Sequence, residues 1–97
     1  MTHRDPVLRV VAAAIFIKGD DQRHDLVLSC PRPARHHNVI YCAARLGVEL
    51  DGSEEQGFLL SDGSFAQRKP ALDIAWRAGQ LLRETAPHLG LFSEDVW

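Results

Sequence analysis

The segment from Glu54 to Gln80 constrains the fold more than any other part of the sequence. Residues 54–60 end in the apolar run Phe58-Leu59-Leu60, which predicts a strand. Asp62-Gly63 follows, a dipeptide that two-residue hairpin loops favour. Phe65 then begins a short return strand. The segment therefore predicts a β-hairpin that leads directly into a helix.

The helix is expected from about Arg68 to Thr85, because its apolar residues recur at helical spacing. These residues are Ala71, Ile74, Ala75, Ala78, Leu81 and Leu82. Pro70 falls in the first turn, where a missing N–H is harmless, and we expect Pro87 and Gly90 to end the helix. Gly79 would lie in its interior at a cost of about 1 kcal/mol, which indicates that a strand, a second subunit or a ligand approaches closely.

The N-terminal half predicts two strands and a helix. The run from Val7 to Ile17 is apolar and reads as a central strand buried on both faces. A polar turn separates it from a second strand over 25–30, so the two should pair as an antiparallel hairpin. A helix should begin near His36 and end at Gly47, which can supply a left-handed C-terminal cap.

Together these elements predict one α+β domain over residues 1–97, in the order β-β-α-β-β-α, with a mostly antiparallel sheet and a long C-terminal helix. The tail over 91–97 could add an edge strand or pack its aromatic side chains on the core. A chain of 97 residues has a thin stability margin, so oligomerisation would be a natural way to bury more surface.

The charge, the cysteine count and the hydrophobic pattern limit which partners and which compartment we expect. A formal charge of -2 gives no broad cationic field, so polymeric nucleic acid is a poor candidate. Cys30 and Cys42 are too few for a small secreted domain. Met1–Pro6 does not resemble a signal peptide, and no apolar run could span a bilayer. We therefore expect a cytoplasmic protein with no membrane partner.

Two groups of residues could bind an anionic ligand. Arg35, His36 and His37 precede a predicted helix, whose free N–H groups attract anions, although a solvated loop explains them as well. Phe65 and Arg68 could offer a stacking face and a forked guanidinium, although Phe65 could equally be core. Gln56 and Gln80, each beside a glycine, are open to both interpretations.

Metal binding and catalysis find less support. Cys30, His36, His37 and Cys42 lack zinc-ligand spacing. Glu49, Glu54 and Glu55 do not reproduce the glutamate pattern of a Nudix hydrolase, so that function is rejected. No serine lies in a nucleophile elbow. We expect no metal, no cofactor and no catalytic residue, and keep as an alternative a nucleotide hydrolase with His36 or His37 as base.

One motif string extends over the C-terminal half. It runs Glu55-Gln56-Gly57-Phe58-Leu59, then Asp62-Gly63-Ser64-Phe65, Arg68, Ala71, Ile74-Ala75 and Ala78-Gly79-Gln80, and ends with Leu91-Phe92-Ser93-Glu94-Asp95-Val96-Trp97. This string resembles small phage-encoded proteins, in particular the first-described Thoeris anti-defence family. The Ala-Ala-Ala-Ile run and Arg35-His36 agree more loosely. His37 and the prolines at 31 and 33 depart from the family pattern.

The resemblance implies a binding protein of the host bacterial cytoplasm. Family members sequester the cyclic ADP-ribose signal of bacterial TIR-domain proteins without cleaving it, and some hold cyclic oligonucleotides. They form dimers or higher oligomers such as hexamers, with pockets between protomers. On this basis the expected ligand-binding residues are Arg35, His36, Gln56, Phe65, Arg68 and Gln80. A phage accessory protein that binds a host protein is the further alternative.

Overall fold

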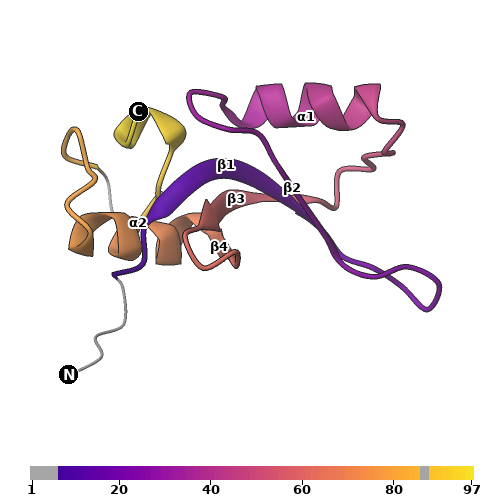
Figure 1. Ribbon diagram of the computed structural model, residues 1–97, viewed down its shortest axis with the longest axis horizontal. Coiled ribbons are helices and arrows are strands. Elements are labelled where there is room, and N and C mark those ends of the chain that lie inside the picture. Colours follow the sequence, from indigo (N-terminus) through magenta and orange to yellow (C-terminus); the bar gives the residue numbers. More distant parts are fainter. Residues whose placement is uncertain (1–6, 86–87) are drawn as a thin grey trace, which may run out of the picture.

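A four-stranded antiparallel sheet forms the centre of the molecule. The computed structural model describes residues 7–85 and 88–97. The strands are β1 (Val10–Ile17), β2 (Leu26–Ser29), β3 (Glu55–Leu60) and β4 (Phe65–Gln67). Their order in the sheet is β2-β1-β3-β4, and each neighbouring pair is antiparallel (Figure 1). The predicted fold class and element order are therefore confirmed.

The second hairpin turns where the sequence predicts, with one residue more than a two-residue loop. Leu60 N–H donates to Ser64 O (2.8 Å) and Gly63 N–H donates to Leu60 O (2.9 Å), so three residues lie between the bonded ends. Gly63 has φ +87°, a left-handed conformation that glycine adopts without strain. The Asp62 side chain accepts from the N–H of Ser64, and this side-chain hydrogen bond stabilises the turn.

The first helix, α1 (His36–Arg45), begins and ends as expected. Arg35 is the cap residue, and its N–H donates to the Asn38 side chain (2.8 Å). At the other end Gly47 has φ +78°, its N–H donates to Ala44 O, and the N–H of residue 48 donates to residue 43. This pair of bonds is a Schellman motif, which satisfies carbonyls that the end of the helix leaves free.

The second helix, α2 (Arg68–Arg77), is shorter than predicted, so the expected end at Thr85 is wrong. Gly79 has φ +70° and lies just after the helix, not inside it. Its N–H donates to Trp76 O, and Gln80 N–H donates to residue 75, the same Schellman motif as at Gly47. No atom lies within 4 Å of a Cβ built at Gly79, so the predicted close approach is also wrong. Pro87, the other expected terminator, lies outside the described residues.

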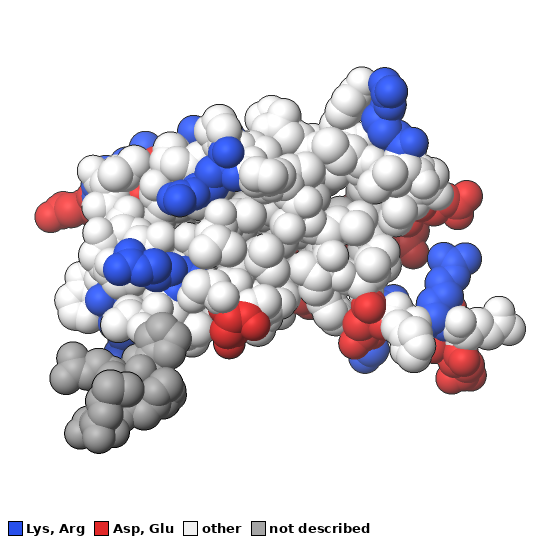
Figure 2. All heavy atoms as spheres, in the orientation of Figure 1, with Lys and Arg blue, Asp and Glu red and all other residues white. Residues whose placement is uncertain are grey.

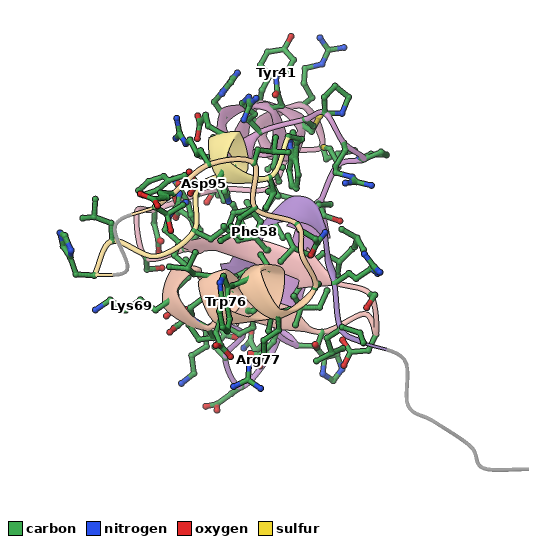
Figure 3. All side chains as sticks on the ribbon, turned by 90° about the vertical axis from the view of Figure 1, so that its left-hand side faces the viewer. Tyr41, Phe58, Lys69, Trp76, Arg77 and Asp95 are labelled. Carbon is green, nitrogen blue, oxygen red and sulfur yellow. The ribbon has the colours of Figure 1, made fainter. Side chains whose placement is uncertain are left out.

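Both helices lie over the same face of the sheet. Ala13 pairs with Phe58, and Phe58 pairs with Ala66, so these three side chains share one face. Ala13 belongs to the cluster under α1, whereas Phe58 and Ala66 belong to the cluster under α2. Trp97 packs against both clusters, and Figure 3 shows Phe58 between α2 and the C-terminal segment.

The C-terminal tail, residues 91–97, packs on the core and contributes a single turn, η1 (Ser93–Asp95), with no edge strand. Leu91 is fully buried and Val96 is 6% exposed. Asp95 is buried as well, and its carboxylate accepts from Arg83 Nε and from Phe92 N–H, each at 2.8 Å. A buried carboxylate needs such donors, so this pair attaches the segment after α2 to the tail.

The opposite face of the sheet carries small residues beneath two aromatic rings. Ala14 is fully buried, and it pairs with Gly57. Phe16 and Phe65 lie with their ring centroids 5.5 Å apart, and a Cβ at Gly57 would meet the ring of Phe65 at 2.5 Å and the backbone of Ala66 closer still. Phe65 is thus a packing residue over Gly57.

Candidate functional site

Arg68, the first residue of α2, is held by three neighbours. Nη1 donates to Leu91 O and Nη2 donates to Gln56 Oε1, both at 2.8 Å. The guanidinium carbon lies 4.4 Å from the centre of the Phe92 ring, a cation–π distance. Burial lowers the pKa of Arg68, while the nearby carboxylates of the tail oppose that shift. The group stays charged and is fixed in orientation.

A hollow of about 390 Å³ opens beside this guanidinium. We call it the Arg68 hollow; it is lined by Glu55, Gln56, Gln67, Arg68, Lys69 and Leu89. A guanidinium has five N–H groups, of which Arg68 gives two to the acceptors above, so three remain for other acceptors. With Lys69 alongside, the hollow presents two cations, two amides and the carboxylate of Glu55, which accepts from Gln67 at 3.1 Å. The cations and amides suit a phosphate and a polar ring edge.

His36 lies inside the protein, bonded to the strand that carries Gln56. Its side chain is 8% exposed, and Nε2 donates to Gly57 O at 2.6 Å. The ring meets Phe58 edge to face, with centroids 5.1 Å apart. Burial is the main cause that lowers the pKa of His36; the bond to Gly57 and the charge of Glu94 oppose it, and Arg68 adds to it.. This nitrogen is engaged by the protein, which weighs against His36 as a base for an external substrate.

Arg35 binds the tail. Its Nη1 donates to Ser93 Oγ and its Nη2 donates to Trp97 O, both at 2.8 Å, and Glu94 lies 3.9 Å away. The indole of Trp97 donates in turn to Ala34 O at 3.3 Å. These contacts explain a basic residue at this position without a ligand, because buried Ser93 needs a partner.

Three of the six residues expected to bind a ligand meet around Gly57. Gln56 is its neighbour in β3, His36 bonds its carbonyl, and Arg68 bonds Gln56. Arg35 caps the same helix as His36, but its guanidinium is bonded to the tail. The role of all four residues in binding a ligand stays a prediction.

Phe65 and Gln80 lie elsewhere. Phe65 pairs with Leu59 and therefore faces away from the helices, whereas Gln56 faces them. Gln80 binds both backbone groups of Val10, accepting from its N–H and donating to its carbonyl at 2.8 Å. The amide thus acts like a neighbouring strand for β1. The aromatic ring that does contact Arg68 is Phe92, which the sequence did not single out.

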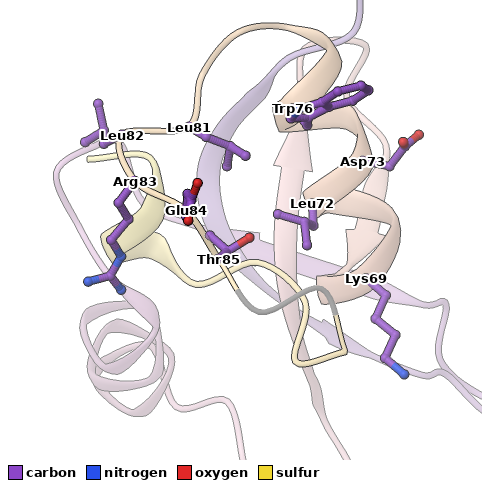
Figure 4. Close-up of a pocket in the computed structure, with 9 residues that line it drawn as sticks. All are labelled: Lys69, Leu72, Asp73, Trp76, Leu81, Leu82, Arg83, Glu84 and Thr85. Atoms are coloured by element: carbon purple, nitrogen blue, oxygen red, sulfur yellow. The ribbon is translucent and has the colours of Figure 1, made fainter.

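A larger hollow of about 820 Å³ lies on the outer side of α2. We call it the Trp76 hollow; it is lined by Lys69, Leu72, Asp73, Trp76, Leu81, Leu82, Arg83, Glu84 and Thr85 (Figure 4). Trp76 is 68% exposed and Leu82 is 67% exposed. Sequence reasoning missed this hollow because it placed residues 81–85 in the helix. A tryptophan outside the apolar stripe was the signal that could have found it.

The charged surface has no continuous patch on the face that Figure 2 shows, where Lys and Arg are separated by uncharged residues. Within residues 7–85 and 88–97, His, Cys, Asp and Glu form no group of three or more that could hold a metal ion. In the same part of the chain, neither helix reaches the length and apolarity of a membrane span.

The fold and the site together define a small α+β domain whose tail is fastened by arginines at the starts of its two helices. A family model for the phage T4 y16D protein matches residues 9–97, and the chain belongs to that family of small phage-encoded proteins. Comparison with curated proteins gave no match, and neither did comparison with solved structures.

Proposed function

We propose that this phage protein binds and sequesters a cyclic nucleotide-type immune signal, such as glyco-cyclic ADP-ribose, without cleaving it. The observation that carries the proposal is Arg68, a fixed guanidinium with N–H groups left over at the wall of the Arg68 hollow. Family membership supports a phage accessory role, and the motif string supports the class of signal.

The hollow's chemistry suits the two ends of such a ligand. Arg68 and Lys69 would bind phosphate oxygens, since a forked guanidinium can give two parallel hydrogen bonds. The oxygen of the Gln56 amide accepts from Arg68, which leaves its NH₂ as a donor. The NH₂ of Gln67 donates to Glu55 at 3.1 Å, which leaves its oxygen as an acceptor. A base or ribose edge could use both groups.

A single protomer offers no stacking face for the base of such a ligand, because the described residues that line the Arg68 hollow include no aromatic ring. A volume of 390 Å³ is also at the lower end of ligand pockets. We therefore propose that a second protomer closes the hollow and supplies the stacking face, in a dimer or a larger homo-oligomer such as a hexamer. Light scattering of the purified protein tests this, and a strict monomer that still binds the signal would refute the shared pocket.

The binding experiment uses glyco-cyclic ADP-ribose as the probe. The protein is incubated with it, separated from free ligand, then heat-denatured, and the released nucleotide is analysed by chromatography. Intact probe in the bound fraction supports sequestration. Cleaved product, or turnover beyond one equivalent, would support the alternative nucleotide hydrolase, and no bound nucleotide would overturn the proposal for this probe.

A second candidate function rests on the Trp76 hollow. An exposed tryptophan beside leucines is typical of protein-binding surfaces, so an accessory protein that binds a host protein remains a proposal. Trp76→Ala should then abolish co-purification of a host partner, whereas Tyr41→Ala, which removes an aromatic ring 62% exposed on α1, should not. Equal loss in both variants would contradict a role for the Trp76 hollow.

A further inference from the structure

Three consecutive residues, Gly90, Leu91 and Phe92, pass directly over Arg68. Gly90 has φ +80°, and a Cβ built there would lie 2.7 Å from both the carbonyl carbon and the Cβ of Arg68. Glycine suits this path because a side chain would overlap the first turn of α2 and the backbone is left-handed. We call this segment the 90–92 clamp.

Leu91 bonds both ends of Arg68. Its N–H donates to the backbone carbonyl of Arg68, and its own carbonyl accepts from Nη1, each at 2.8 Å. The side chain of Leu91 is fully buried in the cluster under α2. One residue anchored in the core therefore holds the backbone and the guanidinium of Arg68 together.

Phe92 adds the ring that lies 4.4 Å from the guanidinium carbon of Arg68. In the exposed Arg45–Tyr41 pair on α1 the same distance is 6.0 Å. The backbone of Phe92 is fixed in turn, because its N–H donates to the carboxylate of Asp95 and its carbonyl accepts from the N–H of Asp95. The ring is thus held in place by the C-terminal turn.

We propose that Phe92 is a positioning residue for the Arg68 hollow, which holds the guanidinium in one plane with its remaining N–H groups ready for an anionic ligand. Phe92 does not line the hollow, so it acts through Arg68 and not by touching the ligand. The inference rests on the proposed function, because it concerns the affinity of the same hollow.

The physical reason is the freedom of a long side chain. An unrestrained arginine loses conformational entropy when it binds a ligand, which weakens the affinity. The 90–92 clamp removes this freedom before any ligand arrives. The ring covers one face of the guanidinium, and the hydrogen bonds form in its plane, so an anion with two acceptor oxygens, such as a phosphate, is received at the edge.

The first test observes Arg68 in the free protein and needs no ligand. NMR of the guanidinium nitrogens measures rotation about the Nε–Cζ bond, which is slow when the group is held. Phe92→Leu should make this rotation about fivefold faster, and Phe92→Tyr should keep it slow. Tyr41→Leu, which removes the ring beside Arg45, is the matched control and should leave the Arg68 signals unchanged.

The second test measures affinity for glyco-cyclic ADP-ribose in a double-mutant cycle. Phe92→Leu should weaken binding about fivefold, and Phe92→Tyr should restore it. In the Arg68→Lys background, Phe92→Leu should have almost no further effect, because the group that it positions is absent.

Two outcomes would overturn the proposal. Unchanged rotation of Arg68 in Phe92→Leu, even with a lower melting temperature, would mean that the ring only stabilises the tail. An equal loss of affinity with and without Arg68 would mean that the ring contacts the ligand itself. If the wild-type protein does not bind the probe, the proposed function fails for that probe, and the rotation of Arg68 still decides whether Phe92 positions it.

Discussion

The two helices end in the same hydrogen-bonded motif, and each has an arginine at its start. Each begins at an arginine, Arg35 as the cap of α1 and Arg68 as the first residue of α2, and each arginine binds the tail. Arg35 bonds to Ser93 and Trp97, whereas Arg68 bonds only one tail carbonyl and faces a hollow with Lys69. The two arginines differ by one position relative to the helix start: Arg35, the cap residue, gives both of its hydrogen bonds to the tail, whereas Arg68, inside α2, gives one to the tail and one to Gln56 and lines a hollow.

The largest effect is expected at Gly57, which joins the two sides of this comparison. Its carbonyl accepts from His36 of α1, and its neighbour Gln56 accepts from Arg68 of α2. A Cβ there would meet backbone oxygen of Ala66, so Gly57→Ala should destabilise the fold by about 3 kcal/mol through overpacking. Urea unfolding measures this. A loss below about 1 kcal/mol would contradict the close approach of β4.

Arg35→Lys should come next, because it removes the bidentate hold on the tail and leaves buried Ser93 without its donor. We expect a loss of about 2 kcal/mol in unfolding free energy. Affinity for glyco-cyclic ADP-ribose should be unchanged. If affinity falls as far as it does in Arg68→Lys, the distinction between the two arginines fails.

Arg68→Lys should cost about 1 kcal/mol in stability, since a charge remains but the bonds to Gln56 and Leu91 weaken. Affinity for the same probe, measured by calorimetry, should fall at least about tenfold because lysine cannot give a forked pair of bonds. Arg45→Lys, on the exposed side of α1, is the matched control and should leave affinity unchanged. Equal losses in the two variants would argue for a general charge effect.

The far ends of the helices should respond alike. Gly47 and Gly79 both have positive φ in the same hydrogen-bonded motif, and a Cβ at either meets no atom within 4 Å. Gly47→Ala and Gly79→Ala should therefore each cost about 1 kcal/mol, from backbone strain alone. A thermal melt of both variants checks this, and a much larger loss at Gly79 would restore the predicted close approach to that residue.

The smallest effect is expected in the pH dependence of stability. It should depend on His36 and on neither arginine. Burial lowers the folded-state pKa of His36 below the ordinary value of 6.5, so the unfolded chain binds more protons in the window between the two values. Stability should fall as the pH drops below about 6.5 and level off below the folded pKa. His36→Gln should flatten this slope in denaturant titrations at successive pH values. If His37→Gln flattens the slope equally, the assignment to His36 is wrong.

The sequence was sufficient for the strands because hydrophobic runs and turn dipeptides are local signals. It was sufficient for Gly47, because this glycine directly follows Leu46, the last residue of the helical spacing that begins at Val39. The identical chemistry at Gly79 was missed because Leu81 and Leu82 continue the helical spacing, and local pattern could not tell an apolar helix from an apolar loop that packs on the tail.

The sequence did not predict which candidate side chains meet. His36 and Arg68 are linked through Gly57 and its neighbour Gln56, and this meeting of the basic loop with the hairpin exit depends on long-range packing. Phe65 does not join them, because a shift of one residue along a strand moves a side chain to the other face. The contacts of Phe92 and Asp95 depend on where the tail docks, which only long-range packing decides.

The way the tail closes the domain also bears on when the protein can fold during synthesis. Trp97 donates to Ala34 and accepts from Arg35, contacts between residues more than sixty apart in the chain. The sheet can begin to pair as the ribosome releases it, but α1 lacks these partners until residue 97 has left the exit tunnel. The core around Trp97 is therefore completed only after all the strands and both helices have been synthesised, and the partly folded chain leaves apolar residues open to proteases until the tail docks.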